Sequence, residues 1–193
     1  MSINRIIIIV IAVWSAVSCG NRTAKTVGTD QSADVKATVN TELTGMTIDL
    51  PLQRFHAVKD GMVIPPEEWK TYYQEKEYSI IIYFGTGGCT VCEMKACHLW
   101  DDFIDEIDSD NVNYYFVSRP EDGTPLNVLA AVVNESYFSL PVFVDTDNAF
   151  MDANNGLPAI DTHTSFLLDK DGRVLFSGDA WKNIAIIKML VRK

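Results

Sequence analysis

The chain has 193 residues, of which 47% are hydrophobic and 22% are charged, and its formal net charge is −10 at pH 7. This acidic balance argues against binding to nucleic acid and against electrostatic docking on anionic lipid. The length allows one domain of ordinary size with a full hydrophobic core, at about residues 41–193.

The first residues predict export from the cytoplasm. An apolar run, residues 6–17, is too short to span a bilayer comfortably but has the length of a signal-peptide core. It ends in Ala16-Val17-Ser18-Cys19, which resembles the lipobox of bacterial lipoproteins, whose cysteine is lipidated and becomes the first residue of the mature chain. We therefore expect a lipoprotein signal peptide at 1–18 and a lipid anchor on Cys19. The alternative is an ordinary secretory signal with a coincidental cysteine.

The segment after the anchor, residues 19–40, is rich in Thr, Ser, Lys and Asp and is too polar to join a core. We expect it to be a flexible tether between the membrane and the domain. The first helix of the domain is predicted at Pro65-Pro66-Glu67-Glu68-Trp69, since proline suits the first turn and acidic side chains suit the positive end of a helix.

The most informative stretch is residues 80–92. The β-branched and aromatic run 80–84 predicts a buried strand, and residues 90–107, after the glycines, predict a helix with an apolar stripe. Between them lies Cys89-Thr90-Val91-Cys92, so the first thiol is placed at a helix N-terminus, where free N–H groups and the macrodipole favour the thiolate. This pattern is typical of a redox dithiol. The alternatives are inert core thiols or half of a zinc site, and no second Cys-x-x-Cys completes a four-thiolate site.

Strands and helices alternate through the rest of the chain. An α/β fold follows, with a mixed β-sheet and helices on both faces. The expected elements are a strand at 112–117, a helix at 126–138, a strand at 141–144, a turn and helix cap at 145–148, a hairpin of strands 164–168 and 174–177, and an amphipathic helix at 179–191.

The pattern resembles the membrane-tethered, TlpA-type thioredoxin-like thiol-disulfide oxidoreductases. The resemblance lies in the strand, the Cys-x-x-Cys, the helix and the later Ser165-Phe166-Leu167-Leu168-Asp169-Lys170-Asp171-Gly172-Arg173-Val174, and it covers about residues 45–193. It implies a thioredoxin-like fold that needs no cofactor. Cys89 would be the exposed attacking thiolate and Cys92 the buried resolving thiol, with Gly88, Thr90 and Val91 as neighbours.

The resemblance also implies partners and a place of work. Protein disulfides would be the substrates, an envelope electron donor would supply the reducing equivalents, and the direction would be that of a reductase. The protein would work in the cell envelope as a membrane lipoprotein facing the periplasm.

Four positions depart from the pattern of that family. Gly88, Val91 and Cys97 stand where the family usually has tryptophan, proline and a helix-kinking proline, and His163 stands where it has a cis-proline. The predicted strand 80–84 also lacks a buried acid that could relay protons to the second thiol. We expect Cys97 to be a small buried hydrophobe, because it borders the apolar stripe of its helix.

His163 motivates a different class of function. Cys89, Cys92 and His163 together could hold copper or zinc, since two thiolates and one imidazole suit these ions. A third hypothesis is an interaction protein that kept the fold but lost turnover. The residues alone leave these alternatives open.

Overall fold

The computed structural model describes residues 41–108, 110–160 and 162–192. The predicted signal peptide, the lipid anchor at Cys19 and the tether, residues 1–40, lie outside the described residues. Within the described ranges, no helix has both the length and the apolar character needed to cross a bilayer.

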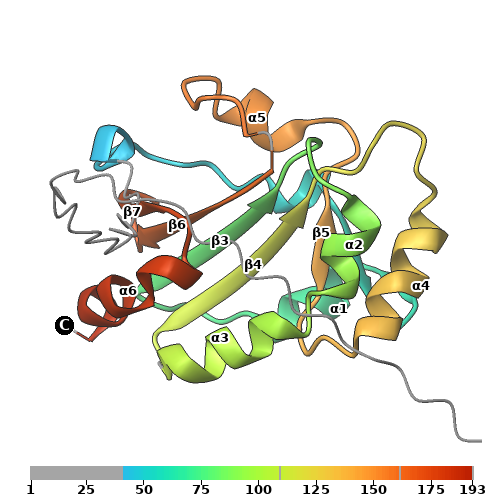
Figure 1. Ribbon diagram of the computed structural model, residues 1–193, viewed down its shortest axis with the longest axis horizontal. Coiled ribbons are helices and arrows are strands. Elements are labelled where there is room, and N and C mark those ends of the chain that lie inside the picture. Colours follow the sequence, from blue (N-terminus) through green and yellow to red (C-terminus); the bar gives the residue numbers. More distant parts are fainter. Residues whose placement is uncertain (1–40, 109, 161, 193) are drawn as a thin grey trace, which may run out of the picture. The chain divides into compact units, whose positions relative to one another are not determined.

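A mixed sheet of seven strands, counted over the described residues, forms the centre of the domain (Figure 1). Its order is β2-β1-β5-β4-β3-β6-β7. β3, β4 and β5 run parallel, whereas β6 is antiparallel to β3 and β7 is antiparallel to β6. The strands are β1 (His56–Lys59), β2 (Met62–Ile64), β3 (Tyr78–Phe84), β4 (Val112–Ser118), β5 (Val142–Val144), β6 (His163–Asp169) and β7 (Val174–Gly178).

Helices cover both faces of the sheet. One hydrophobic cluster joins one face to α2, α3, α4 and α6. A second cluster joins the other face to α1 and α5. The helices are α1 (Pro66–Trp69), α2 (Thr90–Lys95), α3 (Leu99–Ile107), α4 (Leu126–Ser136), α5 (Ala149–Ala153) and α6 (Ile184–Val191), with short 3-10 turns η1 (Thr41–Leu43), η2 (Leu52–Arg54), η3 (Lys70–Tyr72) and η4 (Trp181–Asn183).

The arrangement β4-β3-β6-β7 is the core of a thioredoxin-like fold. The parallel strands β3 and β4 are connected through α2 and α3, the antiparallel hairpin β6-β7 lies on the other side of β3, and α6 follows the hairpin. The predicted α/β, thioredoxin-like fold with helices on both faces is therefore confirmed.

A hairpin that the sequence analysis did not predict extends the sheet. β1 and β2 pair antiparallel around Asp60 and Gly61, and β1 also pairs antiparallel with β5. Both turn residues have positive φ, 49° and 80°, as a tight turn between twisted strands requires. An Asp-Gly pair between two short apolar runs is a known hairpin pattern, so the signal was present in the sequence.

The single helix predicted at 90–107 is wrong, because the chain turns at residues 96–98 between α2 and α3. At this turn the backbone bonds shorten to i→i−3, as between Cys97 N–H and the Met94 carbonyl. The Lys95 carbonyl accepts a hydrogen bond from Nδ1 of His98, at 3.0 Å. His98 thereby satisfies a carbonyl at the end of α2 that the following turn leaves free.

Asp145 caps α5 from a fully buried position, as the predicted turn and cap require. Its two carboxylate oxygens accept from the N–H groups of Ala149 and Phe150, at 2.7 and 3.0 Å. The side chain is 0% exposed, so no water replaces these bonds.

We expect Asp145→Ala to lower the free energy of unfolding by about 2 kcal/mol or more, because two buried N–H groups lose their acceptor. Urea unfolding monitored by circular dichroism measures the change. Asp147→Ala is the matched control, since Asp147 only pairs with Arg54 at the surface. We expect little change there. Equal losses in the two variants would contradict the role of Asp145.

Candidate redox site

The site lies where the central strand ends. β3 ends at Phe84, and the N–H of Gly85 then donates to the Thr162 carbonyl just before β6. The loop 85–88 leads to Cys89, which is the N-cap residue of α2. Because β3, β4 and β5 are parallel, this loop lies at the carboxyl edge of all three strands.

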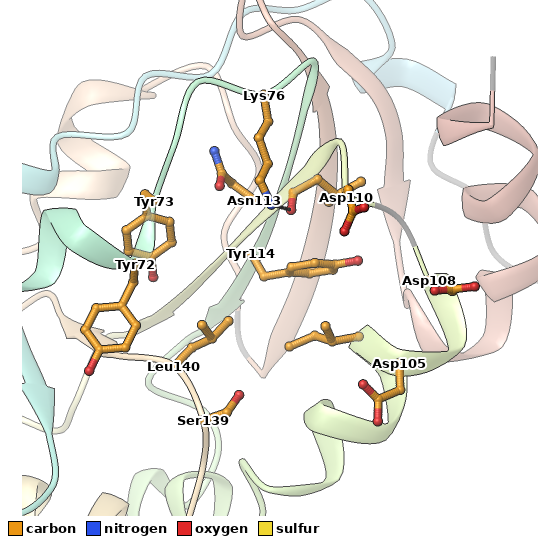
Figure 2. Close-up of a pocket in the computed structure, with 12 residues that line it drawn as sticks. Tyr72, Tyr73, Lys76, Asp105, Asp108, Asp110, Asn113, Tyr114, Ser139 and Leu140 are labelled. Carbon is orange, nitrogen blue, oxygen red and sulfur yellow. Dashed lines mark hydrogen bonds between the residues drawn. The ribbon is translucent and has the colours of Figure 1, made fainter.

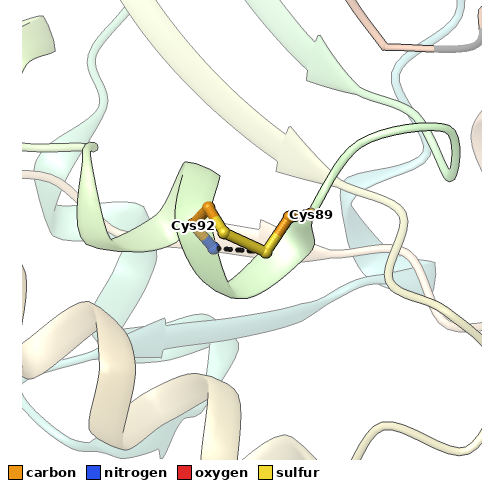
Figure 3. Close-up of a disulfide and its surroundings, with 2 residues drawn as sticks. All are labelled: Cys89 and Cys92. Atoms are coloured by element: carbon orange, nitrogen blue, oxygen red, sulfur yellow. Dashed lines mark hydrogen bonds between the residues drawn. A yellow bond between two sulfur atoms is a disulfide. The ribbon is translucent and has the colours of Figure 1, made fainter.

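Cys89 and Cys92 form a disulfide at the start of α2 (Figure 3). Their Cα atoms are 5.2 Å apart. The N–H of Cys92 donates to Sγ of Cys89, at 3.2 Å. After reduction, the same N–H group and the positive end of the helix would stabilise a thiolate on Cys89.

Both cysteines are exposed, so the prediction of a buried Cys92 is wrong. The reason is the face that α2 buries. Thr90 and Met94 lie on the buried face, and Cys92 is two residues from either of them, which is about 200° around a helix. A second protein can therefore approach both residues.

The other predicted neighbours of the dithiol have different surroundings. Gly88 and Val91 are half-buried, and Val91 packs against the core cluster of α2, α3, α4 and α6. Thr90 is buried, and its hydroxyl has no hydrogen-bond partner among the described residues. The structure thus brings Gly88, Thr90 and Val91 to the disulfide through the turn and helix that carry it.

His163 is the first residue of β6 and lies opposite Phe84 in the register of β3 and β6. Its ring is exposed, with its centroid 6.2 Å from that of Phe84. No hydrogen bond or ion pair of the described residues joins it to Cys89 or Cys92. The described peptide bonds are all trans. A role for His163 at the dithiol stays a prediction.

A metal site made by Cys89, Cys92 and His163 has no support in this geometry. Among the described residues, no group of three His, Cys, Asp or Glu side chains is placed to hold a metal ion. The two thiols are joined to each other here, and a metal needs them as separate thiolates.

Glu93 is a residue of the site that the sequence analysis missed. Its carboxyl group folds back over Gly88, so that Oε1 occupies the space that a Cβ at position 88 would need. Its Oε2 is buried and has no hydrogen-bond partner in the part of the chain that the structure describes, and burial raises the pKa of the carboxyl. A carboxyl whose pKa is raised holds a proton more readily than an ordinary glutamate, so Glu93, directly after Cys92, is suited to exchange protons at this site. Only its place beside the second cysteine signals this in the sequence.

Cys97 is the small buried hydrophobe that the sequence predicts. It is 1% exposed and belongs to the core. Burial, together with the charges of Glu93 and Asp101, raises the pKa of its thiol to about 12. It therefore stays protonated and takes no part in thiolate chemistry at neutral pH.

Comparisons with solved structures give remote likenesses. No family model and no curated protein matches the chain. The thioredoxin domain of a thiol-disulfide oxidoreductase from Bacteroides vulgatus is 11% identical, with a TM-score of 0.49 over 77% of this chain and 97% of that one.

Two further solved structures are similar at the same remote level. Peroxidoxin BcpB from Mycobacterium tuberculosis is 15% identical, with a TM-score of 0.46 over 77% of this chain and 96% of that one. StoA from Bacillus subtilis is 21% identical, with a TM-score of 0.41 over 54% of this chain and 74% of that one. The fold assignment therefore rests on the order and register of the strands.

We expect Gly88→Ala to push the Glu93 carboxyl into solvent and to bring its pKa back toward the ordinary value. The added methyl group would overlap Oε1, which can move away because it ends a flexible side chain. An NMR titration of the glutamate carboxyl carbons in the two proteins measures the pKa. Gly156→Ala is the control, since its added methyl would meet only Met46. A Glu93 pKa that stays raised in Gly88→Ala would contradict this packing.

Gly88→Ala should also change how the free energy of unfolding depends on pH. A raised acid pKa stabilises the fold below the ordinary value of 4.5, and this contribution is lost as the pH rises through the folded-state pKa. In Gly88→Ala the folded-state pKa of Glu93 should lie closer to 4.5. We therefore expect the free energy of unfolding to fall less than in the wild type as the pH rises above 4.5.

Proposed function

We propose that the protein is a thiol-disulfide oxidoreductase that exchanges electrons with protein disulfides through Cys89 and Cys92. The observation that carries the proposal is the disulfide itself, which closes between two exposed cysteines at the start of α2. A disulfide that only stabilised the fold could be buried, whereas exchange requires that another thiol reach a sulfur atom.

In the reducing direction, the Cys89 thiolate attacks one sulfur of a substrate disulfide. A Cys89–substrate disulfide forms and the first substrate thiolate leaves. The Cys92 thiolate then attacks Sγ of Cys89, which releases the second substrate thiolate and forms the Cys89–Cys92 disulfide. The substrate gains two electrons and two protons, and an envelope electron donor returns the pair to its dithiol form. The oxidised pair described above is the product of this sequence.

Glu93 supplies the proton transfer that the second attack needs. The Cys92 thiol must lose its proton before it attacks Cys89, and the Glu93 carboxylate, whose pKa is raised by burial, is the acceptor that follows it in the chain. It follows Cys92 directly in the chain and packs against the residue before Cys89. It would thus do the work of the buried acid that the strand 80–84 lacks.

The reductase direction and the envelope location complete the proposal. Both come from the resemblance to TlpA-type proteins and from the exported N-terminus that the sequence predicts. Outside the cytoplasm, disulfides persist, so a reduced dithiol there needs a dedicated electron donor. A lipid on Cys19 would hold the domain at the membrane surface, and two acyl chains suffice for stable anchoring.

We expect Cys92→Ser to accumulate covalent complexes with envelope proteins, because the mixed disulfide on Cys89 can no longer be resolved. Cys89→Ser should trap little, since its remaining thiol lacks the stabilising N–H bond of the helix start. Non-reducing gels of cells that express each variant measure the complexes. Equal trapping by both variants, which the exposure of both cysteines permits, would remove the distinction between attacking and resolving thiol.

We expect the mature chain to begin at a lipidated Cys19. Mass spectrometry of the purified membrane fraction identifies the N-terminal residue and its acyl chains. Cys19→Ser should release the protein from the membrane or leave it unprocessed. A mature N-terminus at any other residue without lipid would overturn the anchor and leave an ordinary secreted protein.

A further inference from the structure

A polar cavity lies at the end of the sheet away from the dithiol (Figure 2). It has a volume of about 510 Å³, which is within the range of small-molecule sites. The first residues of β4, the second half of α3 and the segments that precede β3 and β5 form its walls. None of these residues belongs to the redox site, so its function is independent of the redox proposal.

Three carboxylates make one side of this cavity acidic. Asp105, Asp108 and Asp110 line it, all three are exposed, and their carboxylates form no hydrogen bond or ion pair with another described residue. Of the described residues that line it, Lys76 alone has a cationic side chain. Carboxylates on one side of a cavity favour a ligand of positive charge.

A buried hydroxyl points to the same side. Tyr114 is 6% exposed, and its hydroxyl has no hydrogen-bond partner among the described residues. Figure 2 shows this hydroxyl directed between Asp105 and Asp110, toward Asp108. The hydroxyl of Tyr73, another lining residue, also has no hydrogen-bond partner in the described part of the chain. Buried hydroxyl groups without partners are uncommon in folded proteins, so they indicate an absent donor or acceptor.

One alkylammonium group, the end of the Lys76 side chain, already lies in the cavity. Nζ of Lys76 donates to the Val112 carbonyl, at 3.1 Å, and leaves the three carboxylates and the Tyr114 hydroxyl unpaired. A metal ion fits less well, because the structure places no three carboxylate, thiolate or imidazole groups of its described residues for metal binding. The unpaired carboxylates and the Tyr114 hydroxyl suit a ligand that carries a positive charge and several N–H donors.

We propose that this cavity binds a small aliphatic primary amine in its ammonium form. The ammonium group donates to the Tyr114 hydroxyl and to the carboxylates of Asp105 and Asp110. The methylene chain of the ligand lies against the apolar side chains of Ile104 and Leu140, which also line the cavity. The same ammonium chemistry occurs in a free amine and in the lysine side chain of another polypeptide.

Isothermal titration of the full chain with 1,4-diaminobutane tests the proposal. We expect one equivalent to bind, and Tyr114→Phe to weaken the binding about tenfold, the loss of one hydrogen bond to a charged group. Asp105→Asn should weaken it by a similar factor. Asp102→Asn is the matched control, because it removes the same charge from the same helix at a residue outside the cavity. It should bind as the wild type does.

Further ligands identify the chemistry and its source. Tetramethylammonium has the charge but no N–H donor, and we expect it to bind at least tenfold more weakly. A lysine blocked at both backbone ends shows whether a polypeptide side chain also enters, and its failure to bind assigns the site to free amines. Equal binding by wild type and Tyr114→Phe, equal weakening in Asp102→Asn, or tighter binding of Ca²⁺ that depends on Asp105 would each overturn the proposal.

Discussion

The complete burial of β3 is the constraint on which the rest of the structure depends. Residues 80–84 are buried one after another, with alternate side chains in the two hydrophobic clusters. A strand that is apolar on both faces needs a neighbour on each side and helices above and below. β4, β6 and the helices satisfy these needs. The chain leaves the sheet only after Phe84, and this exit places the dithiol at the carboxyl edge of the sheet.

The sequence predicted those elements whose patterns are local and strong. Three such patterns agree with the structure: the run 80–84, the Asp169–Gly172 turn and the apolar stripe of α3. Each can be recognised from neighbouring residues alone. The β1-β2 hairpin was missed, because its strands are only four and three residues long and their apolar pattern is short. The break at residues 96–98 was missed since no proline or glycine marks it. The contact of His98 with the Lys95 carbonyl at this break is one that periodicity does not encode.

At the site, the sequence located the two sulfur atoms but not their surroundings. The spacing of Cys89 and Cys92 and their place after a strand sufficed to locate the sulfur atoms. The exposure of Cys92 depends on which face α2 buries, and that face is set by Met94 and by the early end of the helix. The position of the Glu93 carboxyl depends on the space above Gly88. Both are properties of packing between segments, which a single sequence describes poorly.

The contact between Gly88 and Glu93 links two positions that would otherwise seem independent. A large side chain before the first cysteine, such as the tryptophan usual in TlpA-type proteins, would claim the volume that the Glu93 carboxyl fills. The two arrangements are mutually exclusive, so the effect of a change at position 88 depends on which residue stands at position 93. Residues 88 and 93 should therefore show epistasis, and a library that varies them together will contain functional pairs that no scan of single substitutions can find.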